Sequence, residues 1–218
     1  MGKISTEFTT PAEEPKVAAL AFAAARHAEL VDEWTRDRRA EVDSIRPLVK
    51  RRAALGVFNR RRRALLDSGE AFGTASAIIT FYVLEQFELR GWNKAWRVVP
   101  DGQAELRGRR YGVQNNPLKD WTGLLRIYLP DDVAEQLRRA TWWTSWPATR
   151  ELLRLRELDP QGLNASVNRR RQRVLERIVT TGDVLRAALD EATKPWFPTD
   201  AEVRDSRLGA VAALLEQR

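Results

Sequence analysis

Apolar residues recur at helical spacing through the first ninety positions and predict three consecutive helices. The first runs from Val17 to about Asp43. The second begins near Pro47, a residue suited to a first helical turn, and ends at Asp67, before Ser68-Gly69. Its expected apolar stripe is Leu48, Leu55, Phe58 and Leu65. The third covers about residues 70–89 and is apolar on almost every side, so we expect it to be the buried centre of the N-terminal half.

The middle of the chain has the pattern of a small β element. Pro100-Asp101-Gly102 separates two short runs and predicts the turn of a β-hairpin. Residues 124–129 alternate, with Leu125, Ile127 and Leu129 on one side, and predict a strand. Further helices are expected from Pro130-Asp131 to about Trp143, from Ser145-Trp146-Pro147 to about Asp159, from an Asn164 cap to Arg177, after Gly182-Asp183, and over about residues 201–217.

The predicted fold is mainly α, a helical bundle with a small β-hairpin or strand element in the middle of the chain. We expect a flexible tail at residues 1–15, which contain several Thr, Pro and Glu residues. An N-terminal helical bundle at 16–90, a β-containing connector at 91–130 and a C-terminal helical region at 131–218 would follow. The two helical regions can also form a single domain. No internal repeat is visible.

Composition narrows the class of protein further. The 218 residues include no cysteine, so we expect neither a disulfide framework nor thiolate chemistry, which suits a reducing compartment. Glu13 and Glu14 precede the first apolar run, where a signal peptide would be basic. The longest other apolar stretch, residues 71–84, is shorter than the roughly 20 residues that cross a bilayer. We therefore expect a cytoplasmic protein without a membrane partner.

The residues also argue against the common catalytic and metal sites. The single histidine, His27, lies in an Ala-rich helix and is expected to be structural. Zinc would have carboxylates as its only other ligands, and no glycine loop of the phosphate-binding type is present. Asp101 is typical of a turn and Asp131-Asp132 of a helix start. We therefore expect no enzymatic activity and no cofactor.

Positive charge is concentrated in three clusters. The net charge is +7, yet residues 36–66 alone carry +8, residues 106–118 carry +3 and residues 169–177 carry +4, so the remainder is acidic. Of the 37 basic residues 31 are Arg, whose guanidinium binds phosphate oxygens in pairs and stacks on bases. A single charge run is usually a solvated face, but three separate runs in an otherwise acidic chain indicate phosphate contact.

The run Arg60–Arg63 raises a question of placement, because four successive helical residues sweep about 300° of the helix. At least one of them leans toward the apolar side, and Arg62, one turn after Phe58, is the expected one. The predicted nucleic-acid contacts are Arg38, Arg39, Lys50, Arg51, Arg52, Arg60, Arg61, Arg63, Arg107, Arg109, Arg110, Arg126, Arg169, Arg170, Arg171 and Arg173. The eight tryptophans either stack on unpaired bases or fill the core or a partner interface.

Two resemblances extend this interpretation. Residues 124–158, "LLRIYLPDDVAEQLRRATWWTSWPATRELLRLREL", resemble the ribbon-helix-helix family of DNA-binding proteins. The resemblance implies a dimer whose paired strands enter the major groove, with Arg126 and Tyr128 facing the bases and Ser145 and Thr149 near phosphates. A strand and two helices of an ordinary α+β domain fit the same residues. Within residues 17–90, an Arg-rich helix followed by "SGEAFGTASAIITFY" is similar to the small helical subunits of multi-subunit CRISPR effector complexes, which are basic and non-catalytic.

The expected function is non-enzymatic binding of DNA or RNA through phosphate contacts, by a dimeric or repeated subunit of a larger nucleoprotein complex. The alternative is a protein–protein scaffold or assembly factor of the phage or plasmid type. In such a scaffold the Arg clusters would pair with acidic regions of neighbouring copies. The two alternatives share one composition and differ in their response to salt.

Overall fold

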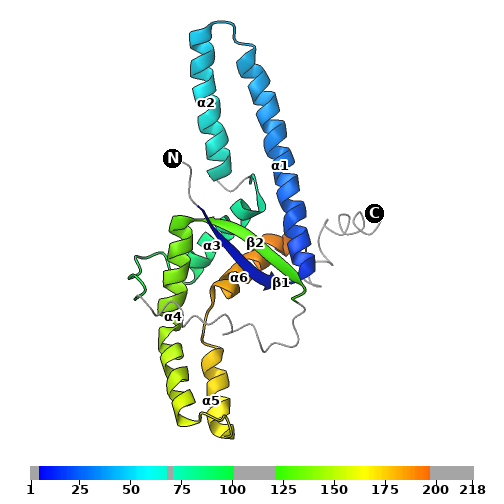
Figure 1. Ribbon diagram of the computed structural model, residues 1–218. Coiled ribbons are helices and arrows are strands. Elements are labelled where there is room, and N and C mark those ends of the chain that lie inside the picture. The colour runs from blue at the N-terminus through cyan, green and yellow to red at the C-terminus, as the bar shows by residue number, and fades with distance from the viewer. Residues whose placement is uncertain (1–4, 68–70, 101–120, 197–218) are drawn as a thin grey trace, which may run out of the picture. The chain divides into compact units, whose positions relative to one another are not determined.

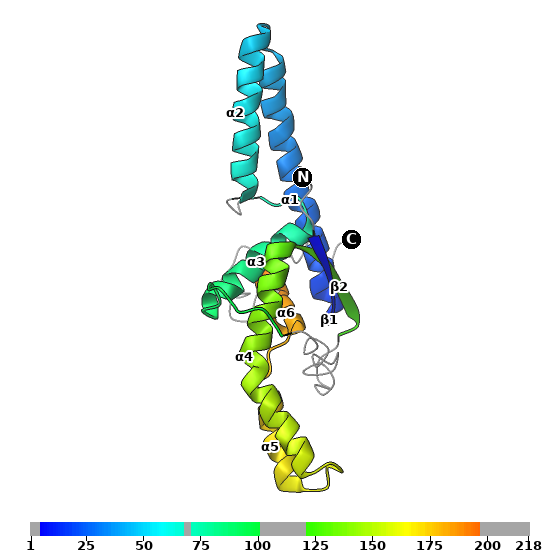
Figure 2. The same ribbon diagram turned by 60° about the vertical axis from the view of Figure 1, so that its left-hand side comes forward.

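The computed structural model describes residues 5–67, 71–100 and 121–196 (Figures 1 and 2). It confirms a mainly helical protein with a small β element. In chain order the described elements are β1 (Ser5–Ala12), α1 (Glu14–Asp43), α2 (Leu48–Asp67), α3 (Ala75–Leu89), β2 (Gly123–Pro130), α4 (Asp131–Leu158), α5 (Ala165–Leu175), α6 (Thr181–Thr193) and the 3-10 turn η2 (Lys194–Trp196). Their contacts form two compact units. The first unit comprises Met1–Glu14 and Val83–Ala188, and the second comprises Pro15–Tyr82 and Leu189–Arg218.

The sheet of the first unit joins two distant parts of the chain. β1 and β2 pair antiparallel, with Ser5 opposite Pro130 and Ala12 opposite Gly123 (Figure 1). The inward side chains of β2 are at most 2% exposed, which confirms the predicted alternation of residues 124–129. Residues 5–12, expected in a flexible tail, form a strand instead. Their composition did not indicate it because strand formation depends on the partner strand more than on local propensity.

Helix α4 is continuous from Asp131 to Leu158, whereas the sequence predicts two helices divided at Ser145-Trp146-Pro147. Pro147 lies inside it and removes a backbone donor, which alone disfavours a helix by about 3 kcal/mol. Tertiary contacts favour continuity. The buried Ser145 hydroxyl donates to the Val179 carbonyl and accepts from the Val179 N–H, both at 2.9 Å.

The segment after α3 lies along α4 and is fixed by side chains of one helical face. Three side chains at spacings of three and four residues donate hydrogen bonds to its backbone carbonyls: Gln136 to Trp92, Arg139 to Trp96 and Trp143 to Arg97. Residues 96–99 were expected as the first arm of a hairpin, but they form no strand, and the carbonyls of residues 96 and 97 accept side-chain hydrogen bonds instead. The rest of that predicted hairpin lies outside the described residues.

Tryptophans contribute to the core of the first unit, which agrees with one of the two alternatives considered for them. Trp92 and Trp142 are buried. Trp142 also stacks on Trp146, with 4.8 Å between ring centroids and 16° between ring planes.

Helix α5 begins at the predicted cap. The Asn164 side chain accepts hydrogen bonds from the N–H groups of Ser166 (3.0 Å) and Val167 (3.3 Å). α5 and α4 then bury a shared apolar cluster that includes Leu152, Leu155 and Val174. α6 is opened by a reciprocal pair, in which Thr180 N–H donates to the Asp183 carboxylate (2.8 Å) and Asp183 N–H donates to the Thr180 hydroxyl (3.1 Å).

In the second unit α1 and α2 lie side by side as an antiparallel helical hairpin (Figures 1 and 2). Both helices end at the predicted residues, Asp43 and Asp67, and α2 begins one residue after Pro47. His27 of α1 meets Phe72 edge-on at 5.2 Å.

Helix α3 begins at Ala75 rather than near residue 70, because the Thr74 hydroxyl accepts the Ala77 N–H and caps it there. α3 buries one face through Ile78, Ile79, Val83 and Phe87, while Leu84 and Leu89 are exposed. The expectation that it is buried nearly all round is therefore wrong for its outer side.

None of the helices in the described part of the chain combines the length and apolar character that a membrane-spanning segment needs. The described residues also contain no group of three or more His, Asp or Glu side chains placed to hold a metal ion.

Candidate nucleic-acid interface

The structure distributes the predicted phosphate-binding residues over both units. Helices α1 and α2 carry Arg38, Arg39, Lys50, Arg51, Arg52, Arg60, Arg61 and Arg63, and bring them together on one helical hairpin in the second unit. Arg126 on β2 and Arg169, Arg170, Arg171 and Arg173 on α5 belong to the first unit. Arg107, Arg109 and Arg110 lie outside the described residues.

The α1–α2 hairpin is held by a narrow apolar seam. Trp34 of α1 stacks on Phe58 of α2, with 5.6 Å between centroids and 19° between planes. Phe58 is 7% exposed and is the one buried side chain among the described positions of α2. Because so little of α2 is buried, most of its surface is available to solvent and to a ligand.

All seven basic side chains of α2 are exposed, namely Lys50, Arg51, Arg52, Arg60, Arg61, Arg62 and Arg63. Residues 48–66 contain no acidic residue. No carboxylate in the described part of the chain lies within ion-pair distance of any of the seven; the ion pairs of this hairpin are those of α1. Helix α2 therefore presents positive charge that the described residues do not compensate.

Part of this charge forms a face directed away from the seam. Arg52, Arg60 and Arg63 share one side of α2 with Gly56 and Asn59, because the spacings between them follow the helical repeat. Between Arg52 and Arg63 the helix rises about 16 Å. A Cβ at Gly56 would have no atom within 4 Å, so a ligand backbone can approach the helix closely between the guanidiniums.

The N-terminal end of α2 adds to the positive potential. Lys50 and Arg51 lie in its first turn, which contains no acidic residue. The helix dipole places roughly half a positive charge at this same end. Basic side chains next to the positive end of the helix dipole destabilise the helix. An anion bound near this end would offset the repulsion.

Arg61, and not Arg62, is the member of the Arg60–Arg63 run that faces α1. Both side chains are exposed, but Arg61 lines the hollow beside Trp34 and Phe58 and Arg62 does not. The prediction for Arg62 is therefore wrong. Residues that face a partner helix alternate at spacings of four and three, and on α2 this places positions 54, 58, 61 and 65 at the seam.

Arg38 and Arg39 differ from the α2 cations because each has a carboxylate partner on its own helix. Arg38 Nη1 lies 3.1 Å and 3.2 Å from the two oxygens of Glu41, and Arg39 Nε lies 2.9 Å from Asp43 Oδ2. Both pairs are solvent-exposed. Exposed pairs contribute about 0–1 kcal/mol, so they compete only weakly with a phosphate.

The α5 cluster is different again, because the two central arginines bind partners within the first unit. Arg170 donates through Nε and Nη2 to Glu151 Oε1 (2.9 and 2.8 Å), and Arg177 binds the other oxygen (3.0 Å). The hydrogen bond from Arg170 is the main cause that holds the pKa of Glu151 below its ordinary value. Arg171 donates to the carbonyls of Leu155 and Asp159.

The remaining α5 candidates, Arg169 and Arg173, are exposed and have no ion-pair partner among the described residues. Two arginines of α4 that the sequence analysis did not select belong to the same region. Arg150 and Arg154 line a groove with Arg170 and Arg177 around Glu151. Their i, i+4 spacing on an amphipathic helix is the signal that could have identified them.

The arrangement implied by the ribbon-helix-helix resemblance is not the observed one. β2 pairs with β1 of the same chain along its whole length, and a single helix follows it. Arg126 lies on the exposed face of the sheet, where its Nε is 3.1 Å from Glu7 Oε1. Ser145 is buried against Val179 rather than placed for a phosphate. The interpretation of residues 124–129 as an intermolecular ribbon is therefore wrong.

Comparisons of the chain with protein-family models, with curated proteins and with solved structures found no match.

Proposed function

We propose that this chain is a non-enzymatic nucleic-acid-binding protein whose α1–α2 hairpin contacts the phosphate backbone, as a dimeric or repeated subunit of a larger nucleoprotein complex. One observation carries the proposal: the seven basic side chains of α2 are exposed and have no carboxylate partner among the described residues. A sequence that only needed a soluble helix would intersperse acidic residues, since opposite charges at i, i+4 stabilise a helix and like charges destabilise it.

A nucleic-acid backbone supplies what the hairpin lacks. Its phosphates are regularly spaced anions, and neutralising them releases condensed counterions, which favours binding without sequence specificity. The face of Arg52, Arg60 and Arg63 extends far enough to contact several of them, and Gly56 lets the strand approach the helix. The positive first turn of α2 favours an anion for the same reason.

The test is the salt dependence of binding by the triple variant Arg52→Gln, Arg60→Gln, Arg63→Gln. Each neutralised phosphate contributes about 0.9 to the slope of log K against log salt on duplex DNA and about 0.7 on a single strand. The triple variant should therefore reduce the slope by roughly two to three units. The melting temperature should change little, because Gln is also a good helix former and the three positions face solvent.

A matched control removes the same charge from the first unit, through Arg150→Gln, Arg154→Gln and Arg173→Gln. If the control reduces the slope as much as the α2 variant, net charge rather than the α2 face governs binding. If the wild-type protein binds neither single-stranded nor duplex nucleic acid at low salt, the proposal is wrong.

A protein–protein scaffold is the second candidate, and the Glu151 site is the observation that favours it. There, two arginines of one cluster converge on a carboxylate of this chain. A neighbouring copy or partner subunit could offer carboxylates to α2 in the same way. If the protein is a scaffold, the ratio of absorbance at 260 nm to that at 280 nm should be that of protein free of nucleic acid. Light scattering should then show self-association that depends on salt. A nucleic-acid-binding subunit predicts co-purifying nucleic acid.

A further inference from the structure

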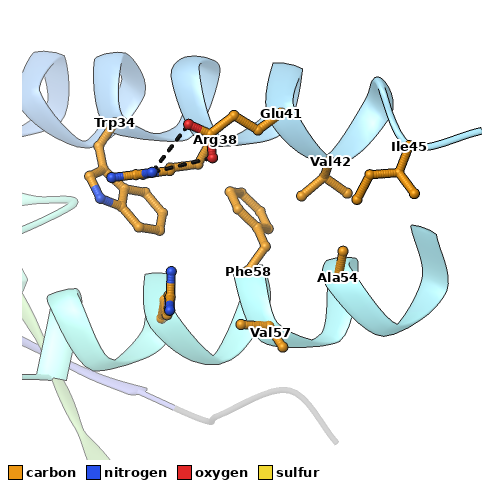
Figure 3. A pocket seen from close by; sticks show the side chains of 9 residues that line it. Trp34, Arg38, Glu41, Val42, Ile45, Ala54, Val57 and Phe58 are labelled. Atoms are coloured by element: carbon orange, nitrogen blue, oxygen red, sulfur yellow. Dashed lines mark hydrogen bonds and ion pairs between the residues drawn. The ribbon is translucent and has the colours of Figure 1, made fainter. Parts of the chain in front are cut away.

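The seam between α1 and α2 is incompletely filled. Its apolar residues surround a hollow of about 310 Å³, lined by Trp34, Val42 and Ile45 of the α1 side and by Ala54, Val57 and Phe58 of α2 (Figure 3). The hollow is open to solvent, and Arg38, Glu41 and Arg61 border it together with these apolar side chains. The small side chain of Ala54 contributes to it, since a larger residue at this seam position would fill the space.

The chemistry of the hollow is that of a site for a planar aromatic group joined to an anion. Its volume is at the lower end of the range for small-molecule sites, about 300–1,000 Å³. One wall is the stacked pair of Trp34 and Phe58, and Trp34 is only half-buried. Aromatic side chains that remain accessible beside a basic surface are the platforms on which unpaired bases stack.

Two guanidiniums line the same hollow, and they differ in what they already bind. Arg38 is held by both carboxylate oxygens of Glu41 (Figure 3). Arg61 has no carboxylate within ion-pair distance in the described part of the chain. Arg61 can therefore bind an anion next to an apolar cavity, which is the arrangement of a nucleotide with its base inside and its phosphate outside.

We propose that this hollow receives an unpaired base of a single-stranded nucleic acid, whose adjacent phosphate binds Arg61. This inference rests on the proposed function and names its substrate class. A paired base is held in its duplex and costs a few kcal/mol to extrude, whereas a single strand offers bases without that cost. The α1–α2 hairpin should therefore prefer single-stranded over duplex nucleic acid.

The test compares three fluorescently labelled probes of equal length by anisotropy: a mixed-sequence single strand, the same backbone with abasic sites, and the duplex. Base–aromatic stacking predicts that the wild-type protein binds the single strand about fivefold to 150-fold more tightly than the abasic probe. Ala54→Leu, which fills the hollow without removing a contact, should reduce the affinity for the single strand to that for the abasic probe. Trp34→Leu, which removes the stacking ring and keeps the seam apolar, should act in the same direction.

Ala53→Leu is the matched control, because Ala53 is the exposed neighbour of Ala54 on the same helix. It should leave all three affinities unchanged, and neither Leu substitution on α2 should lower the melting temperature. Equal affinity of the wild-type protein for the single strand and the abasic probe would overturn the base site while leaving the phosphate contacts intact. The base site would also be overturned if Ala54→Leu left the affinity for the single strand unchanged. Absence of binding to every probe would instead overturn the proposed function itself. In that case light scattering would show whether Ala54→Leu disrupts self-association. If it does, the hollow receives a side chain of a second protein copy.

Discussion

Replacing Arg186 by Met should weaken the attachment of the N-terminal strand to the first unit. Arg186 lies on α6 with its side chain 10% exposed. Its Nη1 donates to the Thr10 hydroxyl (3.0 Å) and to the Pro11 carbonyl (3.3 Å), both in β1. The guanidinium also lies over the Trp121 ring, 4.3 Å from its centroid. Methionine has a similar stem and no donor, so this variant removes the hydrogen bonds and largely keeps the packing.

The cost follows from these contacts. A hydrogen bond to a charged group contributes about 1.5–3 kcal/mol, and contributions of neighbouring bonds do not add fully. Asp183, the ion-pair partner of Arg186, retains the N–H and hydroxyl of Thr180 as donors. Asp183 loses its cationic partner but keeps two hydrogen bonds and is 35% exposed, so the loss should be below the roughly 3–5 kcal/mol of a broken buried pair. We expect about 2–4 kcal/mol, a large part of the roughly 5–15 kcal/mol that stabilises a typical protein.

Hydrogen exchange and thermal unfolding measure the two parts of this prediction. Amide protection of residues 5–12 should fall, because the released strand opens more often. The melting temperature should fall by about 2–4 °C for each kcal/mol in a chain of this length. Arg126→Met is the matched control, since Arg126 also reaches β1, through Glu7, but its side chain is 63% exposed. An exposed pair contributes about 0–1 kcal/mol.

The reasoning would be refuted by equal effects of Arg186→Met and Arg126→Met, or by unchanged exchange of residues 5–12. Either result would mean that pairing with β2 alone holds the strand. If Arg186→Met does not fold, Thr10→Val removes a single acceptor from the same site. It should then give a smaller loss of the same kind.

The remaining predictions concern two glycines and one carboxylate. Gly123→Ala would place its Cβ 2.7 Å from the Cα of Glu14, so backbone must move, and we expect a loss of about 1–3 kcal/mol in denaturant unfolding. Gly56→Ala, with open space in a helix interior, should instead gain about 0.5–1 kcal/mol, and equal stability of the two variants would contradict this. Arg170 lowers the pKa of Glu151 in the folded protein. The interaction of the ionised Glu151 with Arg170 therefore stabilises the fold fully above the ordinary pKa of 4.5, and this stabilisation is lost as the pH falls through the lowered pKa of the folded protein. Glu151→Gln should flatten that part of the pH dependence of the melting temperature, and an unchanged acid limb would contradict the assignment.

Local patterns in the sequence determined the helices and several of their ends. The end of α2 at Asp67 and the start of α5 after Asn164 could be predicted from the sequence. Helix periodicity and capping depend on residues within about four positions of one another. The alternation of β2 was visible for the same reason, since neighbouring side chains on a strand point to opposite faces. The concentration of arginine on α2 is likewise a property of the sequence alone.

Only the tertiary structure decided what these elements contact. The partner of β2 is β1, from the N-terminal segment of the first unit, and no local rule indicates such a pairing. α4 continues through Pro147, and buried residues on both sides of it, including Ser145 bound to Val179, give the single helix tertiary contacts that the local preference for a break does not reflect.

The arginines show the same division most clearly. Sequence placed Arg61, Arg62 and Arg170 in similar runs of positive charge. The fold gave Arg170 a carboxylate from another helix, and it placed Arg61 but not Arg62 at the hollow beside the α1 seam. The physical reason is that a side chain's charge belongs to the residue, whereas its partner depends on which distant segment the packing brings within hydrogen-bonding distance.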